Sequence, residues 1–77
     1  MTDNERFLQE GLNYTKQNIQ NLSNEDILDI LFWARLERKY YWDRDDSIPW
    51  TQTSEDIVCE RVKVIESEIL RRMNKEN

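Results

Sequence analysis

The chain has 77 residues, a net charge of −5, and 35% charged against 38% hydrophobic residues, which suits one small domain with a heavily charged surface. Its single glycine and single proline disfavour a β-fold with many tight turns, and its lack of histidine removes the usual general base. The acidic balance disfavours binding to nucleic-acid phosphates or anionic membranes. We see no apolar N-terminal segment typical of secretion and no run of transmembrane length, so we expect a cytoplasmic protein. From the composition we expect it to be all-α and not an enzyme.

The first predicted helix spans residues 3–20, with Thr2 or Asp3 as its N-cap. Its apolar stripe is narrow and consists of Leu8, Leu12, Thr15 and Ile19. Gly11 lies in the middle of this helix, where glycine costs about 1 kcal/mol relative to alanine. We interpret this glycine as a place where another helix packs closely.

The second predicted helix spans residues 24–42 and has the clearest start in the chain. Ser23 is a favourable N-cap, and Asp26 follows three residues later as a weak capping box. Leu22 and Ile27 have the spacing of a hydrophobic staple across this cap.

This second helix carries apolar residues on two opposite faces. One face consists of Ile27, Ile30, Leu31, Ala34 and Tyr41, and the other of Phe32, Trp33, Leu36 and Tyr40. A small domain needs only one apolar face on a helix to fold. The second face therefore meets the first helix, or it stays open for a partner, and the sequence leaves both interpretations open.

Residues 43–53 form the predicted loop, because Pro49 disfavours helix at the residue before it. A third helix is predicted over residues 54–73, capped by Thr53 or Ser54, with residues 74–77 as a frayed tail. Its apolar stripe consists of Val58, Val62, Ile65, Ile69 and Met73.

The predicted architecture is a single domain over residues 1–77 in which the second and third helices form an antiparallel hairpin. The first helix is expected to pack across this hairpin. Ile48 and Trp50 of the loop are expected to fold back and close one end of the apolar core.

No catalytic, cofactor or metal site is predicted. Cys59 has no histidine to pair with and lies beside the stripe of the third helix, so we expect a small packed side chain. Asp43, Asp45 and Asp46 faintly resemble a calcium loop, but Ile48 occupies the position that the turn glycine would need. A solvated acidic loop is the better interpretation.

Acidic and aromatic residues gather around the end of the second helix. Residues 43–56 hold five acids against one base, Arg44. Acidic groups steer a basic partner toward a surface, and aromatic rings supply contact energy once it arrives. The candidate protein-binding residues are Trp33, Tyr40, Trp42, Asp43, Asp45, Asp46 and Trp50. The alternative for Trp42 and Trp50 is that they close the end of the bundle.

Two segments resemble a known family. LSNEDILDI (residues 22–30) and IESEILRR (residues 65–72) are similar to the two helices of the sporulation checkpoint protein Sda. The resemblance implies an antiparallel helical hairpin that inhibits a sensor histidine kinase. The extra first helix, the acidic loop and the aromatic run depart from that family. The chain also has the general character of small acidic host-takeover proteins of bacteriophages.

These observations predict an inhibitor or adaptor that binds a bacterial protein with a basic and apolar surface, such as RNA polymerase, a nucleoid-associated protein or a kinase. Two alternatives remain open. One is a structural module that forms a homodimer through the second face of the middle helix. The other is a local acidic mimic, in which residues 43–56 block a nucleic-acid-binding site.

Overall fold

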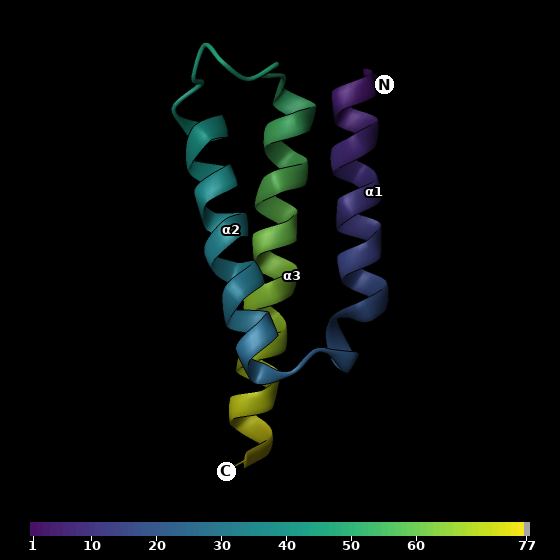
Figure 1. Cartoon of the computed structure of the whole chain (residues 1–77), viewed down its shortest axis with the longest axis vertical. Helices are drawn as coiled ribbons and strands as arrows, with labels where there is room; N and C mark the ends of the chain where they lie inside the picture. Colours follow the sequence, from purple (N-terminus) through teal and green to yellow (C-terminus); the bar gives the residue numbers. More distant parts are fainter. Residues whose placement is uncertain (77) are drawn as a thin grey trace.

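The computed structural model describes residues 1–76 and confirms a small all-α domain. Its helices are α1 (Asp3–Asn18), α2 (Asn24–Trp42) and α3 (Gln52–Glu76), and a 3₁₀ turn, η1 (Ile19–Asn21), follows α1 (Figure 1). α1 and α3 run in the same direction and α2 runs antiparallel to both (Figure 1). None of these helices is long and apolar enough to cross a membrane.

The N-caps of α1 and α2 are those that the sequence predicts. Thr2 Oγ1 accepts a hydrogen bond from the Glu5 backbone (3.1 Å), and the Glu5 carboxylate accepts one from the Thr2 backbone (2.7 Å), which completes a capping box. Ser23 Oγ accepts from the Asp26 backbone (3.1 Å). α1 ends two residues before the predicted boundary, because the chain tightens into η1 at Ile19.

The predicted cap of α3 is wrong. The helix begins at Gln52, and its cap is Thr51, whose Oγ1 accepts from the Ser54 backbone (3.0 Å) while Ser54 Oγ accepts from the Thr51 backbone (2.8 Å). This reciprocal pair places Ser54 inside the first turn, where it is fully buried. Thr51 Oγ1 also donates to the Glu5 carboxylate (2.6 Å), so one carboxylate joins the starts of α1 and α3.

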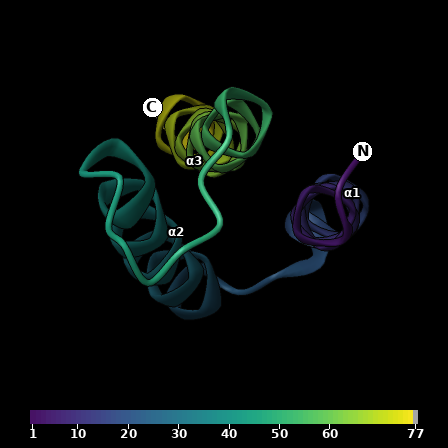
Figure 2. The same cartoon turned by 90° about the horizontal axis from the view of Figure 1, so that it is seen from above.

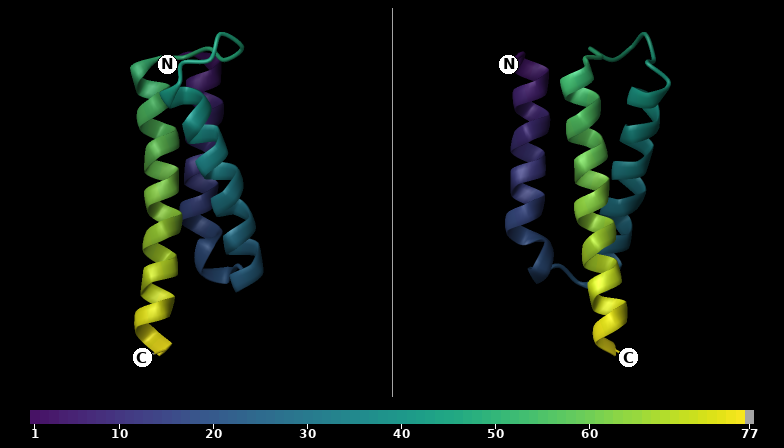
Figure 3. Two further views of the ribbon diagram at one scale, coloured as in Figure 1. Left: turned by 90° about the vertical axis from the view of Figure 1, so that its left-hand side faces the viewer. Right: turned by 180° about the vertical axis from the view of Figure 1, so that it is seen from behind.

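The end of α3 also differs from the prediction. The helix continues beyond Met73 to Glu76, so most of the expected tail at 74–77 is helical. Residue 77 lies outside the described part of the chain. The last turns of α3 project past the connection between α1 and α2 (Figure 3).

α3 is the central helix of the domain. It packs against both α1 and α2, whereas α1 and α2 make little contact with each other. Seen from the end, the two outer helices lie on either side of α3 and form an open V (Figure 2). The expected hairpin of the second and third helices is therefore present, with the first helix on α3 rather than across both.

The core consists of two clusters along α3. The cluster nearer the α1–α2 connection contains Ile19, Ile27, Leu31, Ala34, Val62 and Ile65. The cluster nearer the loop contains Leu8, Leu12, Tyr41, Ile57 and Val58, with Ile48 and Trp50 packed against it. The two loop residues thus close one end of the core, as the sequence predicts.

α2 ends in a Schellman motif, which directs the loop back over the core. The Asp45 backbone donates to the Tyr40 carbonyl (3.2 Å) and the Arg44 backbone donates to the Tyr41 carbonyl (3.2 Å). Arg44 takes the left-handed position of this motif with φ 49°, where glycine is usual. The turn brings the Arg44 guanidinium 4.0 Å from the centroid of the Trp50 ring.

Candidate protein-binding surface

The second apolar face of α2 is open to solvent. Phe32, Trp33 and Tyr40 are 61%, 57% and 46% exposed, and Leu36 is half-buried. α1 leaves this face uncovered because its own stripe packs on α3. The sequence left two interpretations open: the first helix covers this face, or the face stays open. In the isolated chain the face is open.

A shallow groove of about 480 Å³ lies between the later half of α2, the loop and α3. Its lining consists of Trp33, Leu36, Glu37, Tyr40, Tyr41, Ile48 and Arg61. Three aromatic residues, one carboxylate and one guanidinium therefore line the same groove. Mostly apolar linings with a few polar groups are typical of sites that orient a bound group.

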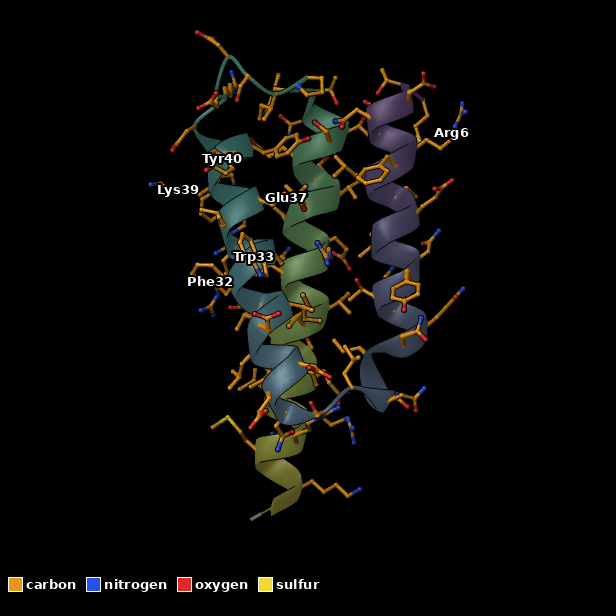
Figure 4. All side chains as sticks on the ribbon, viewed as in Figure 1. Arg6, Phe32, Trp33, Glu37, Lys39 and Tyr40 are labelled. Carbon is orange, nitrogen blue, oxygen red and sulfur yellow. The ribbon has the colours of Figure 1, made fainter. Side chains whose placement is uncertain are left out.

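The two charged residues of the groove form a partly buried ion pair. Glu37 Oε1 lies 3.7 Å from an Arg61 amino group, and the two side chains are about one-third exposed or less. Figure 4 shows Glu37 pointing from α2 toward α3. Burial raises the pKa of Glu37, and the Arg61 charge offsets only part of that rise. Arg61 is shared, because its Nε also donates to Thr15 Oγ1 on α1 (3.2 Å).

Trp42 lies at the end of α2 and is 54% exposed. The Arg38 guanidinium stacks 4.3 Å from the centroid of its ring. Arg38 Nε is buried and has no hydrogen-bond partner among the described residues. The stacking on Trp42 is the main interaction that compensates for burying this nitrogen. Trp42 therefore remains accessible on one side and is shielded on the other.

Trp50 has a different environment from the other candidate aromatics. It is half-buried against the core cluster near the loop, and its Nε1 donates to Glu55 (3.2 Å). The Arg44 stacking described above covers part of its remaining surface. These contacts favour the structural interpretation of Trp50, which holds the loop on the bundle.

The three candidate aspartates are exposed but differ in local role. Asp43 is the C-cap of α2. Asp45 accepts hydrogen bonds from the Ser47 hydroxyl (2.6 Å) and backbone (2.8 Å), which lower the pKa of Asp45 and stabilise the turn. Asp46 is an exposed residue of the same loop.

Among the described residues, no three histidine, cysteine or acidic side chains come close enough to hold a metal ion. Cys59 is a free thiol on α3 and is half-buried. Two residues that line the groove, Glu37 and Arg61, were not among the candidates from the sequence. Both read as ordinary surface charges in the sequence, and only the packing of α2 on α3 brings them together.

No protein family, curated protein or solved structure was found to match this chain.

Proposed function

We propose that this protein binds another protein and changes its activity without catalysing a reaction itself. The observation that carries this proposal is the pair of exposed rings, Trp33 and Tyr40, beside the partly buried Glu37–Arg61 ion pair in one solvent-open groove. A small soluble domain gains nothing for its own stability from rings that stay in water. Such rings are typical of residues that dominate a binding interface.

The chemistry of the groove favours a partner with a basic side chain flanked by apolar ones. The faces of tryptophan and tyrosine attract a cation, and the Glu37 carboxylate lies in the same groove, where it pairs with Arg61 at 3.7 Å. Asp43 and Asp46 at the nearby end of α2 raise the rate of approach of a basic surface. We therefore expect inhibition or adaptation of a bacterial protein, with RNA polymerase, a nucleoid-associated protein and a sensor kinase as candidates.

The test compares partner capture by matched variants that keep the fold. Immobilised wild-type protein, Trp33→Ala and Leu70→Ala are incubated with a bacterial lysate, and bound proteins are quantified by mass spectrometry. Leu70 is a matched control because it is a 58% exposed apolar residue on α3, outside the groove. Capture of the specific partner should fall by about 30-fold for Trp33→Ala, the effect of removing an interface hot spot, and stay unchanged for Leu70→Ala.

Circular dichroism confirms that each variant is folded before capture. Equal capture of the same proteins by the wild type and by Trp33→Ala would refute the groove as the binding site. Partner capture by Tyr40→Phe distinguishes the contribution of the Tyr40 ring from that of its hydroxyl. If the ring acts by stacking, this change should cause little loss of capture.

A further inference from the structure

The two outer helices leave a position open between them. α1 and α2 both pack on α3 but make little contact with each other, and seen from the end they are the arms of an open V (Figure 2). The three helices thus take three of the four positions of a four-helix bundle. The fourth position lies between α1 and α2, diagonally opposite α3, and no helix of the described chain fills it. We call this position the open corner.

Three polar contacts show which sides of α1 and α2 border the open corner. Asn4 of α1 donates to the Tyr41 hydroxyl of α2 (3.0 Å). Arg61 of α3 pairs with Glu37 of α2 (3.7 Å) and donates to Thr15 of α1 (3.2 Å). These contacts run between the arms of the V along its floor. The side chains that follow them around each outer helix, away from α3, therefore border the open corner.

On α1, the strip beside Asn4 and Thr15 consists of Phe7, Gly11 and Tyr14, by the helical spacing of 3.6 residues per turn. Phe7 and Tyr14 are 71% and 68% exposed. Gly11 lies between them, and a Cβ added there would meet nothing within 4 Å. Glycine in a helix interior destabilises the helix relative to alanine, and no close contact within the chain compensates for this. A glycine at this place instead allows the backbone of another helix to approach closely.

On α2, the corresponding strip carries Trp33 and Tyr40, which also line the groove. The groove thus lies along the α2 arm of the open corner, and α1 supplies a second arm with exposed rings. An extended segment in the corner would bring unpaired backbone N–H and C=O groups against helices whose own backbone groups are already bonded. A helix pairs its own backbone groups, so the two arms favour a helix as the occupant.

The acidic residues that border the open corner have no basic partner of their own. Asp26 and Asp29 lie on the same side of α2 as Trp33 and are exposed. Neither forms an ion pair within the described part of the chain. Arg61 on the floor is already paired with Glu37. The unpaired charges that border the corner are therefore negative.

The basic residues of the two arms lie on other sides of their helices, by the same helical spacing. These residues are Arg6, Lys16, Arg35, Arg38 and Lys39. Figure 4 shows Arg6 and Lys39 pointing outward to opposite sides of the molecule. The open corner is therefore complementary in charge to a basic helix and repels an acidic one.

We propose that the partner binds through one amphipathic α-helix, which occupies the open corner and packs on α1 and α2 together; this rests on the proposed binding function. An apolar stripe on that helix covers the exposed rings of both arms, and lysine or arginine beside the stripe meets Asp26 and Asp29. α1 has 16 residues and is about 24 Å long, so a helix of about that length spans the corner. The closest approach is at Gly11, where no side chain intervenes.

Two synthetic peptides as long as α1, 16 residues, test the helix and its charge. The basic peptide has a leucine stripe flanked by lysines, and the acidic peptide has glutamates in place of the lysines. Fluorescence anisotropy should show the wild-type protein binding the basic peptide with Kd of about 10–100 µM, at least about tenfold more tightly than the acidic peptide. Equal binding of the two peptides, or no binding of the basic peptide at about 1 mM, would overturn the proposal.

Gly11→Gln locates the bound peptide. The longer side chain occupies the place of closest approach, so the basic peptide should bind about tenfold more weakly. Glutamine has a higher helix propensity than glycine, so Tm should not fall and unfolding cannot account for the loss. Asn13→Gln is the matched control, because Asn13 is exposed on the far side of α1, and it should leave the affinity unchanged. Equal affinities for the wild type and Gly11→Gln would contradict the open corner as the site.

Capture from the lysate separates this proposal from the proposed function. A partner that is lost with Trp33→Ala but kept by Gly11→Gln leaves the groove as the binding site and overturns the helix in the open corner. A partner that is kept by Trp33→Ala overturns the proposed function itself.

Discussion

Arg72 joins α3 to the α1–α2 connection and to the start of α2, and replacing it with methionine should be the most informative test of the fold. Its guanidinium donates to three carbonyl oxygens of the α1–α2 connection, those of Ile19, Gln20 and Leu22 (3.1, 3.4 and 2.7 Å). It also donates to the Asn24 side chain (2.7 Å) and to the Glu68 carboxylate (2.8 Å). The Arg72 side chain is only 20% exposed, so water cannot fully replace these bonds.

The expected loss for Arg72→Met is about 3 kcal/mol. Hydrogen bonds to a charged group contribute about 1.5–3 kcal/mol, and the partners left without one lie in a partly buried connection. Methionine keeps the apolar stem, so lost packing adds little. A domain of 77 residues has roughly 4–12 kcal/mol of stability, so the variant stays folded but is clearly weakened. At about 4–8 °C per kcal/mol, Tm should fall by roughly 10–25 °C.

The assay is thermal and urea unfolding at neutral pH, followed by circular dichroism. Arg71→Met is the matched control, because Arg71 also binds Glu68 (2.6 Å) but is 51% exposed and touches no carbonyl of the connection. It should cause a much smaller loss. Equal losses for the two variants would refute the idea that Arg72 acts by holding the connection, and would assign its effect to Glu68 alone.

Acid should destabilise the protein between pH 4.5 and about 2, because hydrogen bonds from Arg71 and Arg72 lower the pKa of Glu68 from 4.5 to about 2. This contribution is complete above pH 4.5 and is lost as pH falls through the folded value. Glu68→Gln should therefore flatten the pH profile of urea unfolding in that interval, and an unchanged profile would contradict the argument. No helix packs closely at Gly11, contrary to the interpretation from the sequence, because an added Cβ meets nothing within 4 Å there. Gly11→Ala in the middle of α1 should therefore raise the free energy of unfolding by about 0.5–1 kcal/mol. A lower Tm for this variant would show that α1 needs the glycine.

Local chemistry was enough to predict the number and type of the elements. Ser23 and Thr2 cap helices where the sequence predicts them, and the first face of α2 is buried as expected, with Ile27 only 1% exposed. The start of α3 could not be predicted from one residue. Thr51 and Ser54 cap the helix as a pair, and Thr51 is fixed further by Glu5 from a distant part of the chain.

The position of α1 was missed because charged residues hide a second stripe on α3. Ile57, Arg61, Val64 and Glu68 follow 4-3-4 spacing, but two of the four are ionisable, so the pattern reads as a solvated face. In the structure, Arg61 binds Thr15 of α1, and Glu68 is 6% exposed beneath its two arginines. Thr15 of α1 is the tertiary partner of Arg61, whereas Arg71 and Arg72 of α3 itself pair with Glu68, and these partners make the face suitable for burial.

The candidate surface was predicted in part. Trp33, Tyr40 and Trp42 are exposed as a binding role requires, but half-buried Trp50 is held by Arg44 and Glu55. Solvent exposure of a ring depends on which helix covers it. Which helix covers the rings of α2 is determined by the second stripe on α3, which positions α1, and not by the sequence of α2 itself.

The placement of α1 also explains why so small a domain leaves so much apolar surface in water. Here α3 occupies the centre, so each outer helix buries one side only and the second face of α2 has no intramolecular cover. Exposing Leu28, Phe32 and Trp33 lowers solubility and contributes nothing to folding. At each of these positions, one substitution to a polar residue would remove the exposed apolar side chain. A second surface that covered these side chains would remove the risk of aggregation, and this is the physical basis of the proposed binding role.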